Sequence, residues 1–222
     1  SNSYSFCDVS GIENSIGGLV GRNTGNCYIN SCNAGGNVSG KDYVGGVVGE
    51  NYDGSQLIEC YGTGNVAGNM YVGGLVGYNR TNMSTEQCYS TGSVSGVSSV
   101  GGLVGINWGS IISYSYSTAD VSGNYTIGGL VGYTSEGNIR NCYSSGKASG
   151  NSTVGKFVGC VSSSDVSSCY WNKETSADIP DFGVSQSSTF NNNSGLLTAG
   201  MKKQSLMPNL GSFSAIWQIR ED

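Results

Sequence analysis

Residues 85–105 read Thr-Glu-Gln-Cys-Tyr-Ser-Thr-Gly-Ser-Val-Ser-Gly-Val-Ser-Ser-Val-Gly-Gly-Leu-Val-Gly, and this stretch decides the fold. It contains two short β-rich segments separated by Ser-Gly turn signals. Alternate positions of the first segment carry small or apolar side chains: Cys88, Ser90, Gly92 and Val94. In the second segment, Leu103 and Val104 are neighbours that cannot both point inward from a regular strand, so a bulge or corner is expected there.

The last five residues of this stretch recur along the chain. Gly-Gly-Leu-Val-Gly occupies residues 17–21, 73–77, 101–105 and 128–132, and close variants occupy 45–49 and 155–159. Successive copies start 28, 28, 28, 27 and 27 residues apart. A Cys-Tyr pair or a variant of it keeps the same phase at Cys32-Asn33, Cys60-Tyr61, Cys88-Tyr89, Ser115-Tyr116, Cys142-Tyr143 and Cys169-Tyr170. Such constant phase excludes a chance similarity.

Each repeat is predicted to fold as one coil of a parallel β-solenoid. A third short apolar segment precedes each Cys position, so the pattern predicts three short strands in every 27–28 residues. One coil cannot bury its apolar face alone, and the stacking of coils supplies the core. The crossover rule for parallel strands makes the winding right-handed. The predicted fold class is therefore all-β, a right-handed parallel β-helix (β-solenoid) of about six coils with a C-terminal cap.

Composition excludes the competing classes. Gly contributes 37 of the 222 residues, which disfavours helices, and no collagen period is present. Leucine-rich repeats need a Leu framework and calcium-binding β-rolls need an Asp-containing nonapeptide, and neither pattern occurs. The chain has no His, so Ser-His-Asp, Cys-His and His-zinc chemistry are absent from it. With a net charge of −5, no basic cluster and no long apolar run, neither nucleic acid nor membrane insertion is expected.

The repeated Gly-Gly-Leu-Val-Gly with its trailing Asn, together with the preceding Cys-Tyr-x-Thr-Gly-x-Val, resembles the GLUG motif. The resemblance covers roughly residues 3–170. GLUG repeats occur in large bacterial surface proteins, including adhesin-type proteins and non-catalytic regions of IgA-cleaving metallopeptidases. The resemblance therefore implies a secreted or cell-surface β-solenoid, and it implies no single activity because the motif is structural. No protease activity carries over, since the signature His-Glu-x-x-His cannot exist in a chain without His.

Two units are predicted, a GLUG-repeat β-solenoid over residues 1–170 and a C-terminal capping segment over 171–222. Both prolines and several aromatic residues lie out of phase beyond Tyr170. These residues are expected to cover the strand edges of the last coil, and residues 196–203 to hold a short helix. The chain is interpreted as a piece of a longer protein whose other domains are its partners.

Two columns of equivalent residues are predicted to be structural. The first follows the pentapeptide and consists of Asn23, Asn51, Asn79 and Asn107, whose amides are expected to hydrogen-bond from coil to coil. The second consists of Cys32, Cys60, Cys88, Cys142 and Cys169. Disulfides are the usual interpretation in an exported protein, but stacked residues lie about 4.8 Å apart, beyond the Cβ separation of a disulfide. Buried free thiols are expected instead, with no metal and no cofactor, because no Cys-x-x-Cys pair is present.

A third column is the candidate binding site. Tyr61, Tyr89, Tyr116 and Tyr143 are expected to point outward from one flat face. Exposed rings stack on sugars or anchor a protein partner, which predicts a host protein or glycan as ligand. The competing interpretation is that the rings stack on one another and shield the sheet.

No catalytic residue is predicted. Enzymes built on β-solenoids gather charged side chains in one cleft, whereas the acids of this chain share no repeat position. We therefore expect a non-enzymatic bacterial repeat module, secreted or at the cell surface, that adheres to a host protein or glycan. The alternative is a passive spacer or stalk that presents another domain of a larger surface protein.

Overall fold

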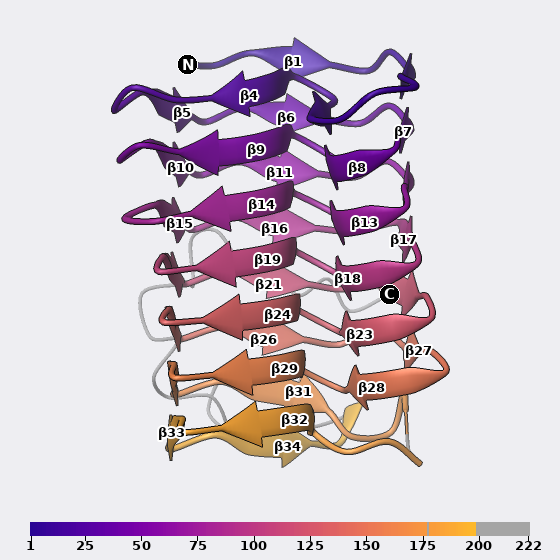
Figure 1. The fold of residues 1–222 in the computed structure, drawn as a ribbon, viewed down its shortest axis with the longest axis vertical. Coiled ribbons are helices and arrows are strands. Elements are labelled where there is room, and N and C mark those ends of the chain that lie inside the picture. The colour runs from indigo at the N-terminus through magenta and orange to yellow at the C-terminus, as the bar shows by residue number, and fades with distance from the viewer. Residues whose placement is uncertain (177, 199–222) are drawn as a thin grey trace.

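The computed structural model describes residues 1–176 and 178–198, which consist almost entirely of short parallel strands (Figure 1). Each regular turn contributes five strands, and equivalent strands of successive turns pair to form five parallel sheets, here called A to E. In Figure 1 sheets C and D form the front, sheet A lies behind them, and sheets E and B close the left and right sides.

The five sheets have the following strands. Sheet A contains β1 (Tyr4–Ser5), β6 (Asn33–Ala34), β11 (Tyr61–Gly62), β16 (Tyr89–Ser90), β21 (Tyr116–Ser117), β26 (Tyr143–Ser144), β31 (Tyr170–Asn172) and β34 (Ser194–Leu196). Sheet B contains β2 (Val9–Ser10), β7 (Val38–Ser39), β12 (Val66–Ala67), β17 (Ser93–Ser95), β22 (Asp120–Ser122) and β27 (Ala148–Ser149). Sheet C contains β3 (Ile16–Gly17), β8 (Asp42–Gly45), β13 (Met70–Gly73), β18 (Ser98–Gly101), β23 (Tyr125–Gly128) and β28 (Ser152–Gly155). Sheet D contains β4 (Val20–Asn23), β9 (Val48–Tyr52), β14 (Val76–Arg80), β19 (Val104–Trp108), β24 (Val131–Ser135), β29 (Val158–Ser162) and β32 (Phe182–Gln186). Sheet E contains β5 (Tyr28–Asn30), β10 (Gln56–Ile58), β15 (Ser84–Glu86), β20 (Ile111–Ser113), β25 (Asn138–Arg140), β30 (Asp165–Ser167) and β33 (Thr189–Asn191).

The predicted all-β parallel β-solenoid is confirmed, with two differences in detail. Each turn has five strands rather than three, because the first two predicted segments each break in the middle. Gly92, at φ 87°, separates β16 from β17, and Gly102 with Leu103 forms the corner between β18 and β19. That corner lets the adjacent Leu103 and Val104 both point into the core, where each is 0% exposed. The solenoid also has about seven turns rather than six, because residues beyond Tyr170 add one more.

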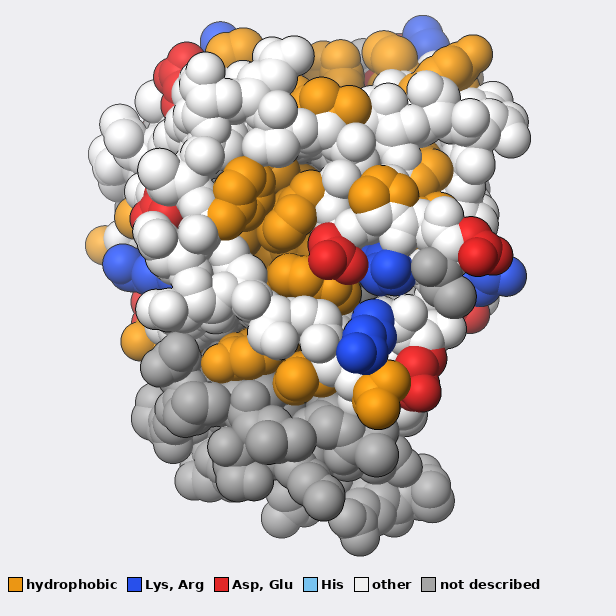
Figure 2. Space-filling view, turned by 90° about the horizontal axis from the view of Figure 1, so that it is seen from below, with side chains coloured by type: hydrophobic (Ala, Val, Ile, Leu, Met, Phe, Trp, Pro, Cys, Tyr) orange, Lys and Arg blue, Asp and Glu red, His pale blue; other side chains and the backbone are white. Residues whose placement is uncertain are grey.

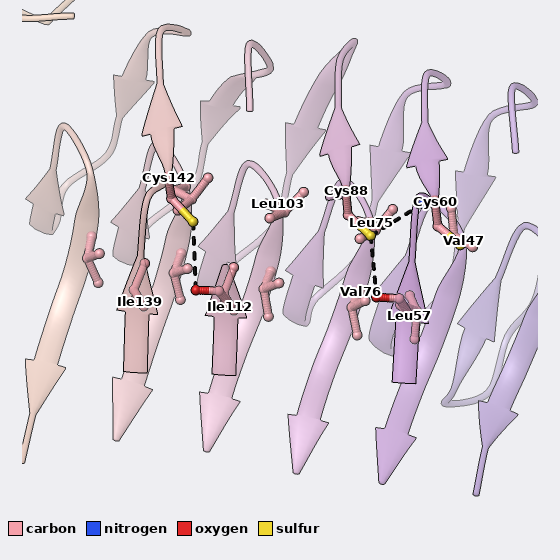
Figure 3. Close-up of a cluster of buried hydrophobic side chains, with 14 of the residues drawn as sticks. Val47, Leu57, Cys60, Leu75, Val76, Cys88, Leu103, Ile112, Ile139 and Cys142 are labelled. Carbon is pink, nitrogen blue, oxygen red and sulfur yellow. Dashed lines mark hydrogen bonds between the residues drawn. The ribbon is translucent and has the colours of Figure 1, made fainter. Parts of the chain in front are cut away.

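Pairing in register places like residues above one another and builds two apolar cores. Val66, Val94 and Val121 pair directly in sheet B, and with the valines of sheet C they form the smaller core. The larger core lies between sheets A, D and E and contains the leucine of each pentapeptide and the cysteine column (Figure 3). A fully buried leucine contributes about 1.5–3 kcal/mol, and each added turn buries a large apolar side chain at this position together with others.

The pentapeptide glycines are required by close backbone approach. A Cβ on Gly73 would lie 2.1 Å from the carbonyl oxygen of Val76 and 2.8 Å from the amide nitrogen of Gly105 in the next turn. Side chains there would force neighbouring turns apart, which parallel strands about 4.8 Å apart do not permit. The left-handed corners of each turn are held mostly by other residue types, such as Glu59, at φ 54°.

Residues 171–198 form the last turn, with a shorter spacing than the repeats. Strands β32, β33 and β34 pair with β29, β30 and β31. Asn193 lies 24 residues after Cys169, and its Oδ1 accepts a hydrogen bond from the Cys169 amide at 2.9 Å. The rest of the predicted cap, residues 199–222 with most of the predicted helix at 196–203, lies outside the described residues. Within the described residues, no helix has the length and apolarity needed to cross a membrane.

An aromatic cluster closes the core at this end. Phe157 replaces the pentapeptide leucine and packs 5.7 Å from Trp171 and 6.2 Å from Phe182, measured between ring centroids. Lys156 replaces a glycine, and its Nζ lies 3.6 Å from Oδ1 of Asp181, which also accepts a hydrogen bond from Trp171 Nε1 at 2.7 Å. Figure 2 shows this end from below, with apolar side chains across its middle and charged residues beside them.

Candidate functional site

The predicted tyrosine column stacks ring on ring along sheet A, and we call Tyr61, Tyr89, Tyr116 and Tyr143 the tyrosine ladder. Successive ring centroids are 4.7, 4.9 and 4.8 Å apart, with interplanar angles of 3°, 11° and 10°. These separations equal the strand spacing because the residues pair directly in register. The neighbouring rings cover both faces of Tyr89 and Tyr116, and a ring face is what a sugar stacks on.

Burial along the tyrosine ladder increases toward its C-terminal end. Tyr61, Tyr89 and Tyr116 are half-buried, whereas Tyr143 is 7% exposed. Burial raises the pKa of Tyr89, Tyr116 and Tyr143, and the neighbouring phenol adds to this shift. At the other end Asn33 takes the tyrosine position, and its Nδ2 donates a hydrogen bond to the Tyr61 hydroxyl. The ladder is therefore a row of phenol rings in mutual contact.

The cysteine column lies buried beside sheet A (Figure 3). The thiols of Cys60, Cys88, Cys142 and Cys169 each donate to the carbonyl oxygen two residues earlier, at 3.1–3.2 Å. Ser115 makes the equivalent bond at 2.8 Å, so the position requires a small hydrogen-bond donor, which cysteine and serine both supply. All eight cysteines are free thiols, and burial raises the pKa of Cys88 and Cys169. Within the described residues, no three His, Cys, Asp or Glu side chains converge as metal ligands do.

The asparagine column forms a hydrogen-bonded ladder that is broken at one residue. Asn23 Nδ2 donates to Asn51 Oδ1 at 2.8 Å, and Asn51 Nδ2 donates to Asn79 Oδ1 at 3.1 Å. Asn79 Nδ2 then turns to Thr85 Oγ1 at 2.9 Å. Asn107, the next member, donates to the Ser110 carbonyl and to Thr134, and its Oδ1 has no hydrogen-bond partner among the described residues. The break coincides with Thr85, the polar residue that pairs between Leu57 and Ile112 in the apolar column of sheet E.

A second surface lies across sheets C and D, on the side of the solenoid opposite to sheet A (Figure 1). It consists of Tyr43, Tyr52, Tyr71, Tyr78, Arg80 and Trp108, which we call the arginine–aromatic surface. Tyr52, Arg80 and Trp108 pair in register on β9, β14 and β19, so they form one row across three turns. Trp108 is 42% exposed.

The three other tyrosines of this surface pack together. The ring centroid of Tyr43 lies 5.0 Å from that of Tyr71 and 5.7 Å from that of Tyr78. Tyr43 and Tyr71 have left-handed backbone, at φ 55° and 60°, and sit at bulges that the strand register skips. A Cβ on Gly77 would lie 2.6 Å from the carbonyl carbon of Tyr43, so the last pentapeptide glycine makes room for the bulge that displays this tyrosine.

Two shallow depressions meet at Tyr78 and Arg80. The first, of about 240 Å³, is lined by Arg22, Glu50, Asn51, Tyr52, Tyr78 and Arg80. The second, of about 370 Å³, is lined by Tyr78, Arg80, Thr81 and Trp108. Burial raises the pKa of Tyr43 and Tyr78, so their phenols remain protonated hydrogen-bond donors to a higher pH than a free tyrosine does.

The two arginines of these depressions differ in their partners. Arg22 Nε lies 2.8 Å from Glu50 Oε2, and its guanidinium carbon lies 5.8 Å from the centroid of the Tyr52 ring. Glu50 also accepts a hydrogen bond from Ser15 Oγ at 3.0 Å. Ion pairs within the described ranges join Arg22 to Glu50 and Lys156 to Asp181, and none includes Arg80. Arg80 is therefore the cation of this surface that is open to a ligand.

The repeat pattern does not predict this surface because its residues vary between turns. The position of Tyr78 carries Glu50 and Ile106 in the neighbouring turns, and the column of Arg80 continues to a serine in β24. One feature of the sequence indicates this surface. Large residues flank the inward asparagine in Glu50-Asn51-Tyr52, Tyr78-Asn79-Arg80 and Ile106-Asn107-Trp108. Alternation on a strand directs both flanking residues outward.

The fold and its repeated positions define a parallel β-solenoid repeat module. The family model of the GLUG motif matches residues 68–95, 96–122 and 123–149, which correspond to three consecutive turns. Residues 68–149 therefore match three consecutive GLUG motifs, as the resemblance predicted. Searches of curated proteins and of solved structures found no significant match.

Proposed function

We propose that this repeat module is a non-enzymatic adhesive element, secreted or displayed on a bacterial surface, that binds a host glycan. The observation that carries the proposal is the arginine–aromatic surface. Its rings and its guanidinium border two shallow depressions, and aromatic faces combined with a few polar groups are the usual composition of a binding site. Binding to a host protein is the other form of the adhesive proposal, since Tyr, Trp and Arg are also enriched in protein interfaces.

The geometry favours this surface over the tyrosine ladder. Both faces of the inner ladder rings are occupied by neighbouring rings at 4.7–4.9 Å. In contrast, the row of Tyr52, Arg80 and Trp108 places a cation between two aromatic side chains, and Trp108 is exposed. Stacking on an exposed indole supplies apolar contact to a sugar ring while nearby donors bind its hydroxyls.

A glycan array with the wild-type chain and two variants tests the proposal. The first variant replaces Tyr52 and Tyr78 by Ser and Trp108 by Ala. The control replaces Tyr125 by Ser, because Tyr125 is a 56% exposed aromatic residue on sheet C outside the surface. Binding that the control retains and the first variant loses supports the proposal. Binding that both variants retain, or that no glycan shows, contradicts it.

The regular stack of turns favours a second candidate, a structural spacer that holds another domain away from the cell. Each turn adds one strand spacing, so the module extends as a rod along the stacking direction. Replacing the module in the intact surface protein by an unrelated rod of equal length separates the two functions. Restored attachment favours the spacer, and lost attachment with all other domains still displayed favours adhesion.

A further inference from the structure

The surroundings of Arg80 specify the kind of glycan. We infer that the arginine–aromatic surface binds an acidic sugar, with the carboxylate or sulfate on the Arg80 guanidinium and the sugar ring against Trp108 and Tyr52. This inference rests on the proposed glycan-binding function and narrows its ligand class. It follows from the position of Arg80, from the aromatic residues beside it and from the ion pair that neutralises the neighbouring Arg22.

Arg80 stands in the middle of an aromatic row. It pairs with Tyr52 on one side and with Trp108 on the other, so about 4.8 Å separates it from each. It borders both depressions, and a ligand in either one meets its guanidinium. The row is about 10 Å long, which matches the reach of a short oligosaccharide rather than of a single small ion.

Arg22 forms an ion pair, whereas Arg80 forms none within the described residues. Glu50 holds Arg22 at 2.8 Å, which leaves this acid and this base neutral as a pair. Across the described residues, Arg80 has no carboxylate within ion-pair distance. A planar guanidinium binds a carboxylate or sulfate through two parallel charge-assisted hydrogen bonds, about twice as strong as those to a neutral hydroxyl.

The attraction is local rather than long-range. The whole chain carries a net charge of −5, so its distant field repels an anion. Charges farther than about 8 Å are screened at physiological ionic strength. Within the described residues, Arg80 is the unpaired charge that lines both depressions, because Arg22 and Glu50 of the first depression pair with each other. Flat rings on both sides of the cation favour a sugar over an acidic peptide, because a pyranose ring presents a face of C–H groups that stacks on an aromatic side chain.

Direct titration with matched oligosaccharides tests the inference. The probes are oligogalacturonate, the same oligomer with its carboxylates methyl-esterified, a sulfated heparin oligosaccharide and poly-glutamate. The variants are Arg80→Gln, Arg80→Lys and, as control, Arg140→Gln, an exposed arginine on sheet E. Arg80 is also exposed, so its replacement leaves the fold intact, which circular dichroism checks.

We expect an acidic oligosaccharide to bind at least about tenfold more tightly than its esterified form, because a charge-assisted hydrogen bond to the guanidinium is about twice as strong as a neutral one. Arg80→Gln removes this preference, Arg80→Lys keeps part of it, and Arg140→Gln keeps all of it. The uronate and heparin arms distinguish carboxylate from sulfate as the anionic group. Equal affinity for the esterified oligomer, equal or tighter binding of poly-glutamate, or failure of both acidic oligosaccharides to bind overturns the inference. If only neutral glycans bind, the result contradicts the acidic ligand and supports the glycan-binding function. If no glycan binds, the result contradicts both.

Discussion

Replacing Asn51 by Ala tests whether the asparagine ladder holds neighbouring turns together. Asn51 is 0% exposed, accepts a hydrogen bond from Asn23 at 2.8 Å and donates one to Asn79 at 3.1 Å. The variant loses both bonds, at about 1 kcal/mol each, and leaves the buried Oδ1 of Asn79 without its donor, which costs a further ~1–3 kcal/mol. The expected loss of unfolding free energy is therefore about 3–5 kcal/mol, a large fraction of the total for a domain.

The control uses the same kind of bond at the surface. Asn151 Nδ2 donates to Asn124 Oδ1 at 3.1 Å, also from one turn to the next, but this pair is exposed. Asn151→Ala should cost no more than about 0.5 kcal/mol, because water replaces the lost partner. Thermal unfolding followed by circular dichroism measures both, and Asn51→Ala should lower the midpoint by about 6–20 °C. Equal midpoints for the two variants would refute the assignment of stability to the buried ladder.

Three further perturbations have defined outcomes. Gly101→Ala places a Cβ 2.0 Å from the Val104 carbonyl oxygen and 2.6 Å from the amide nitrogen of Gly132 in the next turn. It should cost about 3 kcal/mol in urea unfolding, whereas an unchanged midpoint would contradict the close approach of turns. Thr85→Val removes the acceptor of Asn79 and lets that amide pair with Asn107 Oδ1, so stability should change by less than about 1 kcal/mol; a loss above about 2 kcal/mol would show that the ladder does not re-pair. Burial raises the pKa of Tyr78, so its stabilising contribution is complete below the unfolded value of about 10 and is lost as pH rises through the folded value. The ultraviolet difference between wild type and Tyr78→Phe should show this phenolate forming above pH 10, and a midpoint at the value of free tyrosine would contradict it.

Periodicity predicts this fold because repetition amplifies a weak local signal. A single segment such as Val100–Gly105 is ambiguous, but its recurrence in phase with a Cys-Tyr marker requires stacked, equivalent turns. The number of strands per turn was not predictable in the same way, since Gly92 and Gly102 interrupt segments whose apolar pattern is continuous. The repeat pattern does not predict the last turn, because the sequence spacing from Cys169 to Asn193 shortens to 24 residues and Asn193 replaces the cysteine.

Repetition predicts the fold, but it does not predict the candidate site. The tyrosine ladder recurs, and recurrence is what lets its rings stack on each other. Arg80 and Trp108 occur once each at their position in the turn, and this irregularity gives the arginine–aromatic surface its chemistry. In a repeat protein the recurring residues build the scaffold, and the exceptions carry a specific site when they meet on one face.

Chemical-shift mapping of a bound glycan tests the central claim most directly. An acidic oligosaccharide titrated into isotope-labelled protein should shift backbone amides of β9, β14 and β19, in the rows that contain Tyr52, Arg80 and Trp108. The amides of β11, β16 and β21 behind the tyrosine ladder should not move. Shifts confined to the tyrosine ladder, or no shift at saturating ligand, would contradict the assignment of binding to the arginine–aromatic surface.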